Sequence, residues 1–143
     1  MAARFEELDW QETAMGEISL RRRVDPRTES DVYEVKLDDD FLMSSMFTAG
    51  EVELARLGLA LLADQGPFEV VVGGLGLGYT AQAVLADVRV GSLLVVEALG
   101  EVIGWHQRRL IPPGAQLGAG SPGQPSARRG RSAVQSSRWM PKG

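Results

Sequence analysis

The sequence predicts an α/β protein: a partial parallel sheet, preceded by a small antiparallel β segment and followed by a disordered C-terminal tail. Two short apolar strands, each followed by a helical pattern, occupy residues 68–111 in the order β, α, β, α, which is the opening half of a parallel sheet. Residues 11–43 alternate between apolar and polar side chains, as antiparallel strands do. Residues 115–143 have no apolar periodicity.

The composition is that of a single soluble domain. The chain has 143 residues, of which 44% are hydrophobic, enough for one core. It has no cysteine, which excludes disulfides and thiolate metal sites. No apolar run is long enough to cross a membrane, and the N-terminus carries acids where a signal peptide needs basic and then apolar residues. We therefore expect a cytoplasmic protein with no membrane partner.

The charges are distributed unevenly along the chain. All 19 acidic residues lie at or before Glu101, together with 8 basic residues, whereas 7 basic residues and no acid follow from Val102. Such a switch marks segments of different character. Residues 115–143 are rich in Gly, Ser, Pro, Gln and Arg and cannot bury enough apolar surface to offset the entropy of ordering. Because this basic tail lacks interleaved aromatic residues, we expect no specific nucleic-acid partner.

Three strands are expected before residue 47. Residues 15–23 and 31–37 alternate in hydrophobicity, with polar turn residues between them, and residues 41–43 form a third short strand. The run Arg21–Arg23 is interpreted as a strand end on a solvated face rather than as a phosphate contact. The run Asp38–Asp40 is interpreted as a solvated turn, because adjacent carboxylates do not converge easily on a metal. No metal site is predicted.

A core-forming helix follows. Thr48 and Glu51 have the spacing of a capping box, and Gly66 with Pro67 is expected to stop the helix. Apolar residues recur at helical intervals at Val52, Ala55, Leu59 and Leu62.

A glycine-rich loop then follows a strand that is expected to be buried on both faces. Val70–Val72 are β-branched and apolar, and residues 79–86 are helical in character. Glycine directly after a strand allows tight turns and close approach of a ligand. Strand, glycine loop and helix together are typical of a site for a nucleotide-like ligand. The glycines are Gly73, Gly74, Gly76 and Gly78.

Glu97 ends the second apolar strand, 21 positions after Gly76. A nucleotide-binding sheet places a carboxylate here to accept hydrogen bonds from both ribose hydroxyls. The alternative is an acid that is favoured by the dipole of the following helix. The segment Gly76–Ala81 fits the dinucleotide pattern G-x-G-x-x-A, and the same loop fits proteins that bind S-adenosylmethionine or its decarboxylated form. The β segment before the first buried strand favours the second ligand class.

No catalytic residue can be assigned from the sequence. His106 is the only histidine and a candidate base. It shares a helical face with Val102, Ile103 and Leu110, which favours a packed or surface histidine. Tyr79 either flanks the cofactor or packs under the loop, and the sequence does not separate these alternatives.

Residues 10–114 resemble the spermidine synthase-like proteins of the class I, Rossmann-like, S-adenosylmethionine-dependent methyltransferase superfamily. The stretches that carry the resemblance are DVYEVKL, LDDDFLMSS, VVVGGLGLGYTAQAVL and LLVVEALGEVIGWHQRRL. The resemblance implies that residues 73–78 line the methionine and ribose of S-adenosylmethionine or decarboxylated S-adenosylmethionine, with Glu97 on the ribose hydroxyls. It also implies aminopropyl or methyl transfer to a small-molecule substrate. The expected divisions are an N-terminal β segment at 1–47, a Rossmann-like cofactor-binding half domain at 48–114 and a disordered basic tail at 115–143.

The chain departs from the family pattern in three places. Family loops read Gly-Gly-Gly-Asp-Gly-Gly, whereas residues 73–78 read Gly-Gly-Leu-Gly-Leu-Gly. The polyamine-binding side chains have no counterpart in Met43–Val52. The family pattern stops near Gly114, before a third strand and the catalytic aspartate, which predicts a truncated, cofactor-binding half with an aberrant or frame-shifted end.

Two alternatives stay open: an NAD-type dinucleotide-binding fragment, and a non-catalytic truncated remnant. A half sheet would leave the edge of its second strand uncovered. An uncovered edge favours pairing with another chain, for example in a homodimer.

Overall fold

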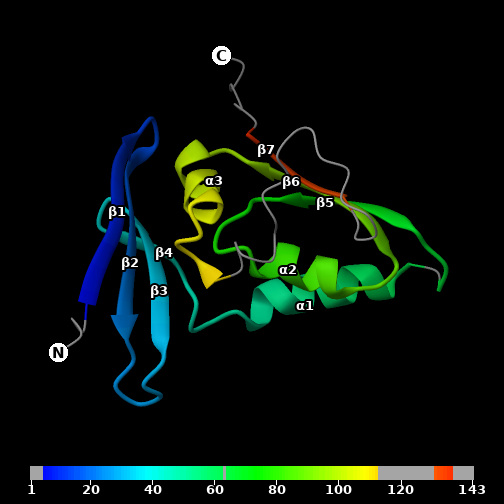
Figure 1. The fold of residues 1–143 in the computed structure, drawn as a ribbon, viewed down its shortest axis with the longest axis horizontal. Helices are drawn as coiled ribbons and strands as arrows, with labels where there is room; N and C mark the ends of the chain where they lie inside the picture. Colours follow the sequence, from blue (N-terminus) through cyan, green and yellow to red (C-terminus); the bar gives the residue numbers. More distant parts are fainter. Residues whose placement is uncertain (1–4, 63, 113–130, 137–143) are drawn as a thin grey trace. The chain divides into compact units, whose positions relative to one another are not determined.

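The structure is a computed structural model that describes residues 5–62, 64–112 and 131–136. The chain divides into two compact units between Thr48 and Ala49. The first unit holds a four-stranded antiparallel sheet, and the second holds a three-stranded parallel sheet with three helices (Figure 1). This arrangement confirms the predicted α/β fold class.

The first unit is an antiparallel meander in the order β1-β2-β3-β4. Its strands are β1 (Phe5–Thr13), β2 (Gly16–Val24), β3 (Asp31–Leu37) and β4 (Asp40–Ser44). The last three confirm the predicted strands, and Asp38 and Asp39 form the exposed turn between β3 and β4. Strand β1 was not expected, since none of its residues is buried and it carries little hydrophobic signal.

The core of this unit is formed by alternating residues on β2 and β3. Ile18, Leu20 and Val35 are fully buried, and Leu20 lies directly opposite Val35 in the β2–β3 ladder. Directly opposed side chains of an antiparallel pair lie on the same face, so the apolar residues gather on one side.

The arginine run on β2 is not simply solvated, which corrects the sequence interpretation. Arg21 and Arg23 each place Nε 2.8 Å from a different oxygen of Glu34, which is buried. Arg22 points to the other face and pairs with Glu6 at 2.6 Å on the surface. Successive side chains of a strand point to opposite faces, so Arg21 and Arg23 share one face and Arg22 lies on the other. Glu34 lies on the face of Arg21, because the two residues are directly opposite each other in the β2–β3 ladder.

The second unit has a parallel sheet in the order β5-β6-β7. None of its helices among the described residues is long and apolar enough to cross a membrane. Helices α1 and α2 lie side by side along one side of β5 and β6 (Figure 1). The elements are α1 (Ala49–Ala60), β5 (Phe68–Gly73), α2 (Tyr79–Ala86), β6 (Val90–Glu97), α3 (Gly100–Gln107) and β7 (Arg131–Ser136).

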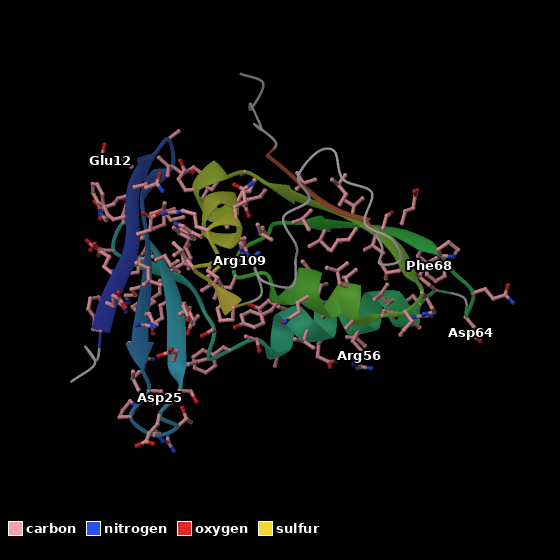
Figure 2. The ribbon with its side chains drawn as sticks, viewed as in Figure 1. Glu12, Asp25, Arg56, Asp64, Phe68 and Arg109 are labelled. Atoms are coloured by element: carbon pink, nitrogen blue, oxygen red, sulfur yellow. The ribbon has the colours of Figure 1, made fainter. Side chains whose placement is uncertain are left out.

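Helix α1 contributes less to the core than its pattern predicts. Only Ala55 and Leu59 are buried, and Leu61, just beyond the helix, is 89% exposed. On the outer side, Arg56 points away from the helix and pairs with Glu53 at 2.6 Å (Figure 2). A stripe of two buried residues suffices to seat this helix against α2.

The strand before the glycine loop is covered on one face only. Val72 is buried, whereas its neighbour Val71 is 66% exposed, so the expectation of burial on both faces is wrong. Strand β5 is the edge of the described sheet, and successive side chains point to opposite faces. The helices therefore cover the face of Val72 and not that of Val71.

Strand β7 is a third strand where the sequence predicts only two. It pairs in parallel with residues 92–97 of β6, with Leu94 opposite Ala133. Residues 131–136 of the predicted tail form this strand, and the rest of 115–143 lies outside the described residues. A strand edge carries free backbone donors and acceptors, so a tail segment can pair there without apolar periodicity. Strand β7 also covers the β6 edge that was expected to be open.

Candidate functional site

The candidate site is the loop at residues 73–78, hereafter the glycine loop, between β5 and α2. Three of its glycines have positive φ angles: +88° at Gly74, +50° at Gly76 and +89° at Gly78. Side chains with a Cβ strongly disfavour this region, so these positions need glycine for the backbone itself. Gly73 differs, because it ends β5 without a positive φ and a Cβ there would meet nothing within 4 Å.

The leucines of the loop attach it to the core. Leu75 and Leu77 are both buried, at 5% exposure. Two backbone bonds fix the ends of the turn: Gly74 N donates to Val96 O at 2.7 Å, and Gly78 N donates to Leu75 O at 2.8 Å. The repeated Gly-Leu pattern therefore combines a backbone that needs glycine with side chains that fill the core.

Glu97, at the end of β6, binds the glycine loop directly. Its Oε2 accepts hydrogen bonds from Leu75 N at 2.8 Å and Gly76 N at 3.4 Å. Its Oε1 accepts from Leu99 N at 2.9 Å, and Leu99 is the N-cap of α3. The side chain is 8% exposed as a residue, so a buried carboxylate joins the loop, the strand end and the helix start.

His106, on α3, binds the same loop from another side. Its Nε2 lies 2.7 Å from Gly76 O. A carbonyl oxygen can only accept, so Nε2 carries the proton. The residue is buried, and Nδ1 has no hydrogen-bond partner among the described residues. Burial lowers the pKa of His106 below its ordinary 6.5, while the bond to Gly76 and the charge of Glu97 act in the opposite direction.

The structure thus separates the candidate residues of the sequence analysis. It brings Glu97 and His106 together on Gly76, and it shows that the histidine is buried, as is Val102 one helical turn before it. Tyr79 begins α2 directly after the loop. The sequence did not reveal the contact between His106 and the loop. The pattern that bears on it is the four-residue spacing of His106 from Val102, which places both residues on one face of the helix.

The run Asp38–Asp40 lies in the first unit, in the turn after β3 and at the start of β4. Asp38 accepts a hydrogen bond from Glu17 N at 2.8 Å in the turn after β3, and all three are exposed. Within residues 5–62, 64–112 and 131–136, no group of three or more acidic, histidine or cysteine side chains is placed to hold a metal ion.

Comparison with known proteins gives a fold likeness. No family model matches the sequence, and no curated protein matches it. Two solved structures match with a TM-score of 0.68 and 16% identity over 92% of this chain: a spermidine synthase in complex with the transition state analogue AdoDATO, and the spermidine synthase from Thermotoga maritima. The chain covers 39% and 41% of these two proteins, about two fifths of their length. The described chain therefore has a spermidine synthase-like fold.

Proposed function

We propose that the glycine loop and Glu97 bind a nucleoside sulfonium, S-adenosylmethionine or its decarboxylated form, as the cofactor-binding part of a spermidine synthase-like transferase. One observation carries the proposal. The buried Glu97 carboxylate lies against the loop and accepts its N–H groups at Leu75 and Gly76. A negative charge is thus held where the ligand would approach the backbone.

This charge favours a cationic ligand over a dinucleotide. The pyrophosphate of NAD binds to free N–H groups of a glycine loop at a helix N-terminus. Here two of those N–H groups already donate to Glu97. A sulfonium centre carries a positive charge, and opposite charges attract most strongly where water is excluded. The NAD alternative is therefore the weaker hypothesis.

Glu97 can also serve the ribose. An ionised carboxylate has about four acceptor positions. Oε1 uses one of them for Leu99 N, and Oε2 uses two for Leu75 N and Gly76 N. The remaining position, on Oε1, can accept one ribose hydroxyl, which is part of the role that the sequence pattern predicts. The matching spermidine synthase was solved with the transition state analogue AdoDATO, which supports decarboxylated S-adenosylmethionine as one candidate.

Transfer to an acceptor needs a further group. An attacking amine must lose a proton, and a positioned base takes it. The titratable side chains bound to the loop, Glu97 and His106, are engaged with the backbone. We therefore assign neither the acceptor site nor its base, for aminopropyl or methyl transfer, to a described residue.

Calorimetric titration tests the proposal. Purified protein would be titrated with S-adenosylmethionine, decarboxylated S-adenosylmethionine and NAD, and the titrations repeated with Glu97→Gln and, as the control, Glu69→Gln. Glu69 is exposed on β5. We expect one sulfonium ligand to bind, with roughly tenfold to hundredfold weaker binding in Glu97→Gln, since bonds to charged groups are the strong ones. Binding of NAD alone, or equal sulfonium affinity in all three folded proteins, would contradict the proposal.

A further inference from the structure

Both backbone polar groups of Gly76, its N–H and its carbonyl, are hydrogen-bonded to side chains. Glu97 Oε2 accepts the Gly76 N–H at 3.4 Å, and His106 Nε2–H donates to the Gly76 carbonyl at 2.7 Å. The two side chains come from different elements, the end of β6 and the interior of α3. Gly76 has a φ of +50° and lies between two other glycines with positive φ, so the backbone itself restricts the loop little.

Only one protonation state of His106 suits this position. The neutral ring with its proton on Nε2 donates to Gly76 and leaves Nδ1 with a lone pair. A second proton would create an N–H at Nδ1, where the atom is buried and has no partner among the described residues. A buried donor without an acceptor is unfavourable. The charged ring would therefore turn or move towards water and release the Gly76 carbonyl.

The charged surroundings of the ring do not reverse this preference. Among the described residues, Glu97 is the group whose charge reaches His106, and it favours the protonated ring. Desolvation opposes the proton and is the larger effect. The ring is consequently neutral at pH 7 and opens its contact with the loop only in acid.

We propose that His106 is a positioning residue for the glycine loop, and that protonation of its ring loosens the loop and weakens ligand binding. The part that concerns ligand affinity rests on the proposed function. The part that concerns the loop conformation does not, so the two can fail separately.

Two variants separate the hydrogen bond from the proton. His106→Phe keeps a ring of similar size and removes the donor. His106→Gln keeps an N–H donor at a similar reach and does not titrate near neutral pH. Amide hydrogen exchange of residues 73–78 would be measured without ligand at pH 7.5 and in half-unit steps below pH 6.5, after correction for the intrinsic pH dependence of exchange. Sulfonium affinity would be measured under the same conditions.

The expected pattern differs for each protein. Wild-type protein shows a protected loop at pH 7.5 that loses protection as the pH falls below the ordinary histidine pKa of 6.5. Its affinity falls roughly three- to tenfold over the same steps, the range of one hydrogen bond. The Phe variant is unprotected and binds weakly at every pH. The Gln variant is protected and binds at every pH.

Other results would overturn either the positioning role of His106 or the proposed function. A Phe variant with wild-type exchange, or a Gln variant that keeps the wild-type pH dependence, overturns the positioning role. If the Phe variant does not fold, the Gln comparison still decides. If the loop exchanges as expected but neither sulfonium ligand binds at pH 7.5, the proposed function fails and the positioning role stands.

Discussion

Gly73 and Gly74 are adjacent in the glycine loop, but only Gly74 has a left-handed backbone, with φ at +88°. A Cβ at either position would meet nothing within 4 Å. The two residues therefore differ in backbone strain and not in available space, which gives a matched pair of substitutions.

Gly74→Ala is expected to lower the free energy of unfolding by about 1–2 kcal/mol, the cost of a left-handed L-residue. Gly73→Ala should change it by much less, because its conformation is open to alanine. Urea denaturation of both variants measures the difference. Equal losses in the two variants would mean that the positive φ at Gly74 does not limit the loop.

A second prediction concerns Glu97, both of whose oxygens accept backbone N–H groups. In Glu97→Gln, the amide NH₂ must face either Leu75 N or Leu99 N, and two donors cannot bond to each other. We expect the free energy of unfolding to fall by about 1–3 kcal/mol, the penalty for an unsatisfied buried donor. Thermal unfolding without ligand measures it, with exposed Glu69→Gln as the control. An unchanged melting temperature would contradict the bonding described here.

The sequence predicted those parts of the fold whose side chains carry the signal. Strand β3 was correct at both ends because its apolar and polar residues alternate from Tyr33 to Leu37. Strand β5, the loop and strand β6 were located because valine and leucine runs meet glycines. The spacing of Glu97 from Gly76 placed the carboxylate near the loop, where the structure has it.

The parts that were missed depend on backbone pairing or on packing. Strands β1 and β7 form along the open edges of other strands, and backbone hydrogen bonds leave no hydrophobic pattern in the sequence. The bond between His106 and Gly76 depends on how α3 packs, and the two residues are 30 positions apart. Burial on both faces of β5 was expected from composition, which does not show whether a strand lies at an edge.

Asp87 gives a prediction about acid stability. Asp87 accepts hydrogen bonds from the side chain and backbone of Arg89, which lower its pKa from 3.8 to about 2. Arg89 also donates to Leu59 O at the end of α1, at 3.1 Å. A carboxyl with a depressed pKa stabilises the fold fully above its unfolded pKa and loses this contribution as the pH falls through its folded pKa.

The stability of the wild-type protein should therefore fall between about pH 4 and pH 2 partly through Asp87. In Asp87→Asn the same interval should show a shallower fall, together with a lower melting temperature at pH 7. Melting temperatures at half-unit pH steps measure both. If the melting temperatures of the two proteins fell in parallel with pH, the ion pair between Asp87 and Arg89 would not contribute to the stability of the fold.

The last prediction compares the buried and the exposed carboxylate that pair with the same arginine run. Glu34 is buried and accepts from Arg21 and Arg23 at 2.8 Å each, whereas Glu6 pairs with Arg22 on the surface. Removal of the buried partner leaves two partly buried cations without compensation, and the partial exposure of both arginines reduces the cost. Glu34→Gln should lower the free energy of unfolding by about 1–3 kcal/mol, and Glu6→Gln by about 0–1 kcal/mol.

Urea denaturation at low and high salt separates these effects. The loss in Glu6→Gln should shrink in salt because exposed pairs are screened, while that in Glu34→Gln should persist. If both variants lose the same small amount and respond alike to salt, the arginines are solvated as the sequence alone indicated. A persistent loss in Glu34→Gln alone would instead establish that this carboxylate, which carries the one buried charge of β3, holds the central strands of the N-terminal sheet together.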